Sequence, residues 1–485
     1  MRIFFFIVFL SILPNFSITQ NYFEKIIGDE KVERINAIIE CDDNSIILVG
    51  ALSQDISSPK KAYLIKLDSS GNILSQIIFE EENIETSICN IYQINSNYYI
   101  FGLYSTTDKK TGGITVSKTD SSFKTIWQSK LHTIDNQRVN YLNSILDSDS
   151  NFVITGYTVP NNSSVNSFFY KVSMGGDSLC SNFEASEEEY SLSFDIIENH
   201  DSSKYYAFVN FFTYIFFPPA HGQIVTLDKQ FNVLGIDSVP HRMQKVYSPL
   251  WINDTTILIS AKSYHNQHNT FDALTLSSTF TPIQHKTYYQ NYSDEFPAFT
   301  NCTSKSKVSS HIYLGSTTNF DNLGGYYSNN DSWFHLVKVD EEINTVWEKW
   351  YGGNAYYVLH SIQSSSQGGC ILVGTRYDNE TQDMETDIYL IKVDGDGLIT
   401  WEKEIPIPQS IAQVYPNPGR NKLRVQTQLK DALFRLTTLE GKTIVEKQIT
   451  QKTSILNTQT LIPGVYFWTL SKDDKIVESG KWVKE

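Results

Sequence analysis

Two histidines, His265 and His268, have a spacing that could begin a metal site. An H-x-x-H pair can offer two imidazoles to one ion, but a metal site needs a third or fourth ligand and partners that orient the ligands. The surrounding sequence supplies no such set. Two histidines in a loop are more often solvated side chains, so we predict no metal at this pair.

A second polar run, Asp147 to Asn151, carries oxygen side chains at its first, third and fifth positions, as calcium loops do. Phe152 stands where the calcium loop of an EF-hand needs glycine, and no glutamate follows at position 12. A similar polar run, Asp42-Asp43-Asn44, follows an apolar strand pattern earlier in the chain, as Asp147 to Asn151 does. We therefore predict a polar hairpin turn at Asp147 rather than a calcium site.

Catalytic motifs are absent from the sequence: it contains no G-x-S-x-G, no H-E-x-x-H and no G-x-x-x-x-G-K-[ST]. We predict no catalytic residue and no cofactor. One enzymatic alternative stays open, because an active site can be assembled from single residues that lie far apart in the sequence and leave no local motif. Acidic residues such as Glu85 and Asp331 would then act as a pair on polysaccharide in a central pocket.

The composition of the 485-residue chain favours β-structure. Phe, Tyr and Trp together number 64, whereas alanine, the best helix former, occurs only 12 times. The 39 basic and 54 acidic side chains give a net charge of −15, which lacks the positive footprint of a nucleic-acid-binding protein. The five cysteines are scattered, so neither a zinc site nor a disulfide framework is indicated. We predict an all-β protein that binds no nucleic acid.

An apolar strand closed by a small residue recurs along the interior of the chain. Successive closing residues are separated by 52, 54, 54, 51, 54 and 59 residues. A period near fifty is typical of a propeller or a solenoid. The closing residues are Gly50, Gly102, Gly156, Asn210, Ala261, Gly315 and Gly374.

A second repeat register agrees with the first. After each closing residue and a polar loop, an apolar strand ends in Lys-x-Asp or a degraded copy. We predict that the repeated Asp accepts backbone N–H groups in the following turn, and that a Trp seven residues later packs between repeats. The strand ends are Asp68, Asp120, Ser173, Asp228, Ser277, Asp340 and Asp394, and the tryptophans are Trp127, Trp347 and Trp401.

The two registers predict a seven-bladed β-propeller over residues 20–405, with four strands in each blade and almost no helix. Closure into a ring is favoured because an open stack would leave its terminal sheets uncovered. Residues 22–28 resemble Trp347–Gly353, so we expect the N-terminal strand to complete or overlay the final blade. A β-helix is the alternative, but its coils are usually shorter and richer in Gly and Asn.

The loops that precede the Lys-x-Asp strands are the predicted binding surface, because such loops gather on one face of a propeller around its channel. Exposed aromatic rings there could stack on sugar faces or anchor proteins, or the same rings could cap the core. The candidate ligand-binding residues are Phe217 and His221 in the fourth loop, and Phe320, Tyr326 and Tyr327 in the sixth.

The N-terminal sequence has the pattern of a signal peptide. Arg2 precedes an apolar run from Ile3 to Leu13, which predicts a Sec-type signal over residues 1–19. Small side chains at Ser17 and Thr19 suit a signal peptidase. The run is shorter than the roughly 20 residues that span a bilayer, and no other run is long enough, so we predict no transmembrane segment in the mature chain.

The C-terminal sequence differs from the rest in charge and motif. Residues 411–485 hold 12 basic and 7 acidic side chains, although the whole chain is acidic. We place a linker at 406–411 and a separate domain at 412–485. The segment Val414-Tyr415-Pro416-Asn417-Pro418, the turn at Gly441, the element Leu461-x-x-Gly464-x-Tyr466 and the basic-apolar tail resemble the C-terminal sorting domain of type IX secretion cargo of Bacteroidetes.

That resemblance implies a small immunoglobulin-like β-sandwich that directs export to the outer-membrane surface or the medium, with the type IX machinery as partner. Gly464, Tyr466, Lys481 and Lys484 are the expected sorting residues; we expect a positive φ at Gly464 and an exposed final strand at 481–485. A carbohydrate-binding or structural sandwich is the alternative.

The run from Gly324 to Gly353 resembles the repeat of secreted Bacteroidetes propellers. This resemblance implies a surface propeller and no particular reaction. The sequence thus predicts a non-catalytic module that binds a glycan or a protein, and the alternative is a secreted polysaccharide hydrolase or lyase.

Overall fold

The structure is a computed structural model. It describes residues 22–108, 111–133, 138–159, 165–184, 190–212, 221–240, 243, 245–265, 268–288, 293–378, 384–399, 412–427, 429–438, 441–472 and 475–485. The expected signal peptide (1–19) and linker (406–411) lie outside these ranges. The chain divides into two compact units between Trp401 and Glu402. The described residues contain no helix, and hence none that could cross a membrane.

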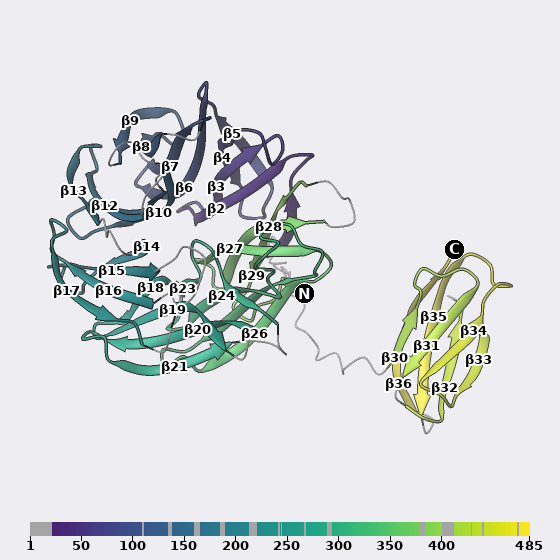
Figure 1. Cartoon of the computed structure of the whole chain (residues 1–485). Helices are drawn as coiled ribbons and strands as arrows, with labels where there is room; N and C mark the ends of the chain where they lie inside the picture. The colour runs from purple at the N-terminus through teal and green to yellow at the C-terminus, as the bar shows by residue number, and fades with distance from the viewer. Residues whose placement is uncertain are drawn as a thin grey trace, which may run out of the picture. The chain divides into compact units, whose positions relative to one another are not determined.

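The first unit is a ring of seven antiparallel sheets, which follow one another around a common centre (Figure 1). The expected seven-bladed propeller is confirmed. The first three blades are β2 (Val32–Glu40), β3 (Ile46–Ser53), β4 (Lys61–Leu67) and β5 (Ile73–Phe79); β6 (Ile84–Ile94), β7 (Asn97–Thr106), β8 (Gly112–Thr119) and β9 (Thr125–His132); and β10 (Arg138–Leu146), β11 (Asn151–Val159), β12 (Asn166–Ser173) and β13 (Ser178–Glu184).

The remaining blades repeat this order. The fourth has β14 (Tyr190–Glu198), β15 (Tyr205–Phe212), β16 (His221–Leu227) and β17 (Val233–Ser238), and the fifth has β18 (Lys245–Asn253), β19 (Thr256–His265), β20 (His268–Ser277) and β21 (Pro282–Tyr288). The sixth has β22 (Glu295–Pro297), β23 (Thr303–Lys305), β24 (Ile312–Thr318), β25 (Trp333–Val339) and β26 (Thr345–Gly352), and the seventh has β27 (Tyr356–Ser364), β28 (Cys370–Tyr377), β29 (Asp387–Val393) and β1 (Phe23–Ile27).

The N-terminal strand closes the ring, as the sequence predicted. β1 pairs antiparallel with β29, from Phe23 opposite Lys392 to Ile27 opposite Ile388. The sixth blade departs from the expected four strands, because β22 and β23 both pair with β24. The innermost strand of that blade is therefore broken in two, and residues 298–302 lie between its halves, outside β22 and β23.

The burial of the inner strands explains why the sequence repeat consists of apolar strands. The second strand of the first blade, β3, is buried at every position because neighbouring blades cover both of its faces. The fourth strand, β5, alternates exposed and partly exposed residues because it lies at the rim. The cores join adjacent blades, and one cluster combines Ile47 and Val49 of the first blade with Ile91 and Ile100 of the second.

The Lys-x-Asp residues shape turns, as predicted. Asp68 Oδ1 accepts hydrogen bonds from Ser70 N at 2.9 Å and Asn72 N at 2.8 Å. The same pattern, from residues two and four positions later, occurs at every other strand end, with the hydroxyl replacing the carboxylate at the two serines. These residues are Asp120, Ser173, Asp228, Ser277, Asp340 and Asp394.

The predicted packing of the repeated tryptophans between blades is confirmed at two positions. Trp347 Nε1 in the sixth blade donates to Gly395 O of the seventh at 3.2 Å. Trp127 of the second blade lies so close to Gly176 of the third that a Cβ on that glycine would come within 2.8 Å of the indole. Trp401 lies outside the described residues.

The second unit is a β-sandwich of seven strands. One sheet has the order β30-β31-β34 and the other β33-β32-β35-β36. Phe434, Trp468 and Trp482 pack between the sheets. The strands are β30 (Ala412–Tyr415), β31 (Lys422–Thr427), β32 (Ala432–Thr437), β33 (Thr443–Ile449), β34 (Thr453–Asn457), β35 (Gly464–Lys472) and β36 (Lys475–Lys484).

Two details expected of the C-terminal segment are wrong. Gly464 is not among the residues with positive φ; it begins β35, opposite Lys484. The tail is not a freely exposed strand, because Trp482 is completely buried and Lys484 is 8% exposed. Lys481 is exposed, and Tyr466 pairs with Trp482 across the sheet. The final strand, β36, lies at the edge of its sheet, and its Trp482 ring belongs to the core of the sandwich.

Candidate functional site

The innermost strands of the blades line the channel, and six of them contain a register shift. Such a β-bulge places an extra residue in one strand and bends it. In β2 the extra residue is Asn36, and in β27 it is His360. The small closing residues of the repeat face this region: a Cβ on Gly50 would overlap the carbonyl oxygen of Arg34, and one on Gly374 would overlap that of Val358. The remaining shifts lie in β6, β10, β14 and β18.

Hydrogen bonds link every innermost strand to the next and form a closed ring around the channel. Most of them use an Asn, Asp or Ser side chain near the bulge, because side-chain oxygens and amides can satisfy backbone groups that have no partner strand. The links are Asn36 Nδ2 to Ile88 O (2.7 Å), Asn90 Nδ2 to Ser144 Oγ (3.1 Å), Asn143 Nδ2 to Asp195 Oδ1 (3.0 Å), Ser248 N to Asp195 Oδ2 (2.9 Å), Cys302 N to Ser248 Oγ (2.8 Å), Asn301 Nδ2 to Ile362 O (2.9 Å) and Glu40 N to Gln363 Oε1 (2.8 Å).

The broken strand of the sixth blade partly fills the channel. Thr300 N donates to His360 O at 2.8 Å, and Thr300 Oγ1 donates to the same oxygen at 2.8 Å and to Asn36 O. Two cavities of about 450 and 230 Å³ adjoin this segment, and both are lined by Thr300, Cys89 and Leu142. We call the larger the mouth cavity and the smaller the channel cavity.

The mouth cavity has a positive lining in an acidic protein. Arg34 of β2, Lys60 of the first blade and Arg138 of β10 contribute three cations, and Glu85 of β6 contributes one carboxylate. Arg34, Glu85 and Arg138 lie at or near the beginnings of innermost strands, and Lys60 directly precedes β4, the third strand of the first blade. The cavity therefore opens at the end of the channel where the innermost strands start. The Arg34 guanidinium lies 4.2 Å from the centroid of the Tyr326 ring.

The Tyr326 ring lies between the Arg34 guanidinium and the His360 ring, and the two rings are tilted by 34°. Their ring centroids are 5.4 Å apart, and Phe299 lies 5.7 Å from His360. Burial, together with the positive charge of Arg34, lowers the pKa of His360 to about 3. The imidazole is therefore neutral at every physiological pH, so Arg34 carries the positive charge in this part of the mouth.

Asp195 is the buried carboxylate of the channel cavity. Burial raises its pKa to about 7, against the opposing effect of hydrogen bonds from Ser248, Ile196 and Asn143. It lines the channel cavity but not the mouth cavity. Its two oxygens accept hydrogen bonds from the third and fifth blades, so its position is explained by the ring of hydrogen bonds.

The predicted ligand-binding residues of the sixth loop divide between core and cavity. Phe320 is only 6% exposed and packs against Phe296 at 4.6 Å, so it caps the core. Tyr327 is half-buried and lies edge-on to Tyr377 at 5.2 Å. Tyr326 lines the mouth cavity. The structure therefore places one of these three rings at the candidate site.

The predicted ligand-binding residues of the fourth loop do not extend the site. Phe217 lies outside the described residues. His221 belongs to β16, opposite Phe211, and its side chain is outside the described set. Arg34 and Arg138, which lie near the starts of innermost strands, belong to no repeated motif, so no sequence pattern marks them as site residues. The Lys-x-Asp repeat points to the loops instead.

The residues named for the enzymatic alternative are not brought together at the mouth cavity. Glu85 lines it, but Asp331 is an exposed loop residue that is not part of its lining. Among the described residues, Glu85 is the sole acidic side chain of the lining. Glycoside hydrolysis uses two carboxyl groups separated by about 5–10 Å.

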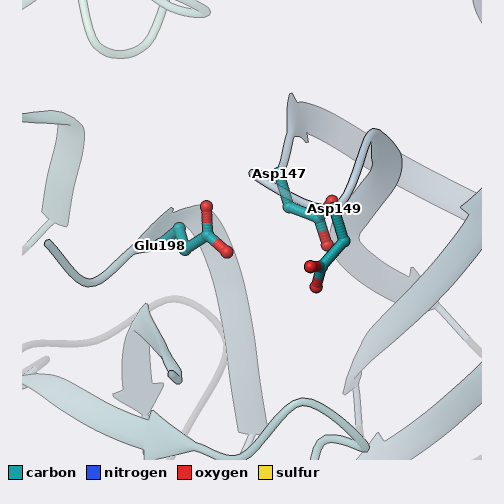
Figure 2. Close-up of side chains that lie close together, drawn as sticks. All are labelled: Asp147, Asp149 and Glu198. Carbon is teal, nitrogen blue, oxygen red and sulfur yellow. The ribbon is translucent and has the colours of Figure 1, made fainter. Parts of the chain in front are cut away.

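Three carboxylates cluster at the opposite end of the strands, where their ion pairs and hydrogen bonds stabilise a hairpin. Figure 2 shows Asp147 and Asp149 on one turn and Glu198 on a separate strand, β14. Lys171 Nζ lies 3.3 Å from Asp147 Oδ2, and Lys229 pairs with both Asp149 and Glu198. The hairpin is held by hydrogen bonds from Asn151 N to Asp147 Oδ1 and from Ser148 N to Glu198 Oε2, each 2.8 Å long.

Two lysines thus partly balance the charge of the three carboxylates. Burial alone would raise the pKa of Asp147, but the Tyr205 hydroxyl, Asn151 N–H and Lys171 ammonium together lower it below its ordinary value. The interpretation of Asp147–Asn151 as a polar hairpin is consistent with these contacts. His265 and His268 face each other at the end of the β19–β20 ladder, and His268 lies 3.8 Å from Asp294.

Comparison with known proteins identifies the C-terminal segment. Residues 413–485 match the family model of the secretion system C-terminal sorting domain. No curated protein matches the sequence.

Solved structures similar to the chain include three proteins of low sequence identity. A puromycin-hydrolyzing peptidase of Mycobacterium tuberculosis is 8% identical (TM-score 0.45), covering 81% of this chain and 58% of its own. The β-propeller domain of the Trilobed protease from Pyrococcus furiosus is 10% identical, with a TM-score of 0.42, and the match covers 76% of this chain and 94% of that domain. Drosophila Plexin A in complex with Semaphorin 1b is 6% identical, with a TM-score of 0.41, and the match covers 76% of this chain and 87% of that chain. The chain thus spans little more than half of the peptidase, and no activity is carried over.

The seven sheets and the C-terminal match together define the class of protein: it is a β-propeller protein that carries a sorting domain. More particularly, the domain is that of the type IX secretion system, so the chain is cargo of that system and is exported from the cell.

Proposed function

We propose that this protein is a non-catalytic binding propeller of a Bacteroidetes cell surface or its surroundings, and that its ligand occupies the mouth cavity. The observation that supports this function is the cavity itself, in which cationic and polar side chains from several blades converge beside Tyr326. Such a concave site with a few fixed charged groups is the usual form of a ligand site.

A secreted hydrolase or lyase is the second candidate, and the lining of the cavity favours binding over it. A glycosidase needs one carboxylic acid and one carboxylate on opposite sides of the scissile bond. Glu85 has no acidic partner among the described lining residues. Arginines close to a single carboxylate suit the retention of a ligand better than proton transfer to it.

The binding function is tested with the secreted full-length protein. A glycan array should show retention of a restricted set of glycans, and incubation with the same polysaccharides should release no shorter or unsaturated products. A Glu85→Gln variant should keep its binding, because this residue supplies no essential proton. Release of products by the wild-type protein and its loss in Glu85→Gln would establish the enzymatic alternative.

The export role of the sandwich is tested by deleting Lys481–Glu485. The deletion removes Trp482 from the core of the sandwich and leaves every propeller residue in place. In a host with type IX secretion, we expect surface labelling to fall while the propeller still unfolds cooperatively. Lys422→Ala, on the exposed side of β31, is the control and should be labelled normally. Equal labelling of deleted and full-length proteins would contradict the export role.

A further inference from the structure

We propose that the ligand of the mouth cavity is a carboxylate-bearing glycan, held by the guanidinium groups of Arg34 and Arg138. This inference rests on the binding function proposed above and names the chemical class of the ligand. The mouth cavity carries three cations against one carboxylate, although the whole chain has a net charge of −15. The positive lining is therefore a local feature that the composition of the chain does not explain.

The two arginines are available for an anion. In the described part of the chain, neither Arg34 nor Arg138 forms an ion pair, whereas Arg376 pairs with Asp378 at 2.7 Å and Arg435 with Glu446 at 2.6 Å. The Nε of Arg34 is buried without a hydrogen-bond acceptor among the described residues, as is that of Arg376, but the Arg376 guanidinium has carboxylate partners and that of Arg34 has none there. Buried polar groups normally have partners, and a guanidinium is a fork of donors that matches a carboxylate.

The position of Arg34 is fixed before a ligand arrives. Its guanidinium lies over the Tyr326 ring, which in turn contacts the His360 ring at a centroid distance of 5.4 Å. Arg34 also precedes the bulge at Asn36, whose side chain is bonded to Ile88 O of the second blade. A preorganised cation loses less conformational freedom on binding than a mobile surface lysine does.

The size and lining of the cavity favour sugar units over a folded protein. At about 450 Å³ the cavity is in the range of pockets for small ligands, roughly 300–1,000 Å³, whereas a protein partner needs a broad surface of about 800 Å². Hydroxyl and amide side chains, including Asn36, Thr86, Ser105 and Asn140, accompany the charges and can bond sugar hydroxyls. The Tyr104 ring also lines the cavity and offers an apolar face.

The test measures binding of the secreted full-length protein to polygalacturonate, to its methyl-esterified neutral form and to polyglutamate. We expect polygalacturonate to bind in a salt-sensitive way and the neutral form to bind at least tenfold more weakly, because the ester removes the charge that the arginines recognise. Arg34→Gln and Arg138→Gln should each weaken binding of polygalacturonate about tenfold or more. Lys124→Gln, which removes one exposed charge at the opposite end of the strands, should have no effect.

Each outcome separates this inference from the function on which it rests. If the neutral form binds as tightly as polygalacturonate, or if Arg138→Gln binds normally while retaining the wild-type melting temperature, the carboxylate assignment is wrong although a binding function stands. If polyglutamate binds and polygalacturonate does not, the ligand is an acidic peptide and the glycan assignment is wrong. If neither the glycan array nor polyglutamate shows binding, the proposed function itself fails.

Discussion

Replacing Lys392 by methionine should destabilise the junction between the last and first blades. Lys392 of β29 and Glu40 of β2 form an ion pair of 3.1 Å in which both side chains are completely buried. Glu40 also accepts hydrogen bonds from Ser365 Oγ at 2.8 Å and Ser366 N at 2.5 Å. The Lys392→Met variant therefore leaves a buried carboxylate that has lost its buried cation but keeps two neutral donors.

The buried Lys392–Glu40 pair determines how much stability the Lys392→Met variant should lose. Removing one partner of a buried pair typically costs about 3–5 kcal/mol, because the remaining charge is uncompensated. Glu40 keeps its two hydrogen bonds, and Lys307 lies 3.5 Å from its Oε2. We therefore expect the free energy of unfolding to fall by about 3 kcal/mol, the lower end of that range. In the double variant Glu40→Gln/Lys392→Met the buried charge is absent, so we expect the combined loss to be smaller than the sum of the single losses.

The assay is urea unfolding of the full-length chain, with the propeller transition separated from that of the sandwich. The matched control is Lys61→Met, because Lys61 forms a similar 2.7 Å pair with Glu80 in which both side chains are exposed. That change should cost less than about 1 kcal/mol. A loss below about 1 kcal/mol for Lys392→Met, equal to the control, would refute the argument that burial gives this pair its importance.

The pH dependence of the same pair has a definite sign. Burial alone would raise the pKa of Glu40, but the Ser366 and Ser365 hydrogen bonds and the Lys392 ammonium lower it below the ordinary glutamate value of 4.5. A lowered folded-state pKa stabilises the protein above the unfolded-state pKa, and this contribution is lost as the pH falls through the folded-state value. Lys392→Met should therefore lose less stability on acidification than the wild-type propeller does.

Three further changes test other features. Gly50→Ala should destabilise the propeller by several kcal/mol and weaken ligand binding, because its Cβ would overlap the Arg34 carbonyl oxygen; Gly235→Ala, whose Cβ meets nothing within 4 Å, is the control in the same urea titration. Because burial raises the pKa of Asp195 to about 7, the contribution of this carboxyl to stability falls by about 4 kcal/mol between pH 4 and pH 8, and Asp195→Asn should remove that contribution from the pH dependence. A chain ending at Pro406 should keep one cooperative melting transition.

The local parts of the fold could be predicted from the sequence because each blade repeats the same short-range chemistry. Asp68 and its six counterparts bond to residues two and four positions later, so their turns leave a pattern in adjacent residues. Gly50 recurs because a backbone approaches it closely, which only a small residue permits. The number of blades and the role of β1 follow from these repeats.

The candidate site could not be predicted in the same way because it is made by contacts between blades. Arg34 and Arg138 are about one hundred residues apart, on the first and third blades, and they line one cavity only when the blades have packed together. Phe320 was expected to be exposed as readily as Tyr326, because a loop sequence does not reveal which ring turns toward the core. The break between β22 and β23 and the burial of Trp482 likewise depend on neighbours that are distant in sequence.

The pairing of β1 with β29 has a consequence for the order of events during synthesis. β1 is the first described strand to leave the ribosome, but its partner is made more than 350 residues later. Until then the last blade lacks its outer strand and the first blade lacks Lys392 beside Glu40. Contacts so distant in sequence form slowly, because a long chain must be brought together before they stabilise anything. The ring must therefore be completed late, and the interval before closure is when a chaperone or protease would meet an open propeller.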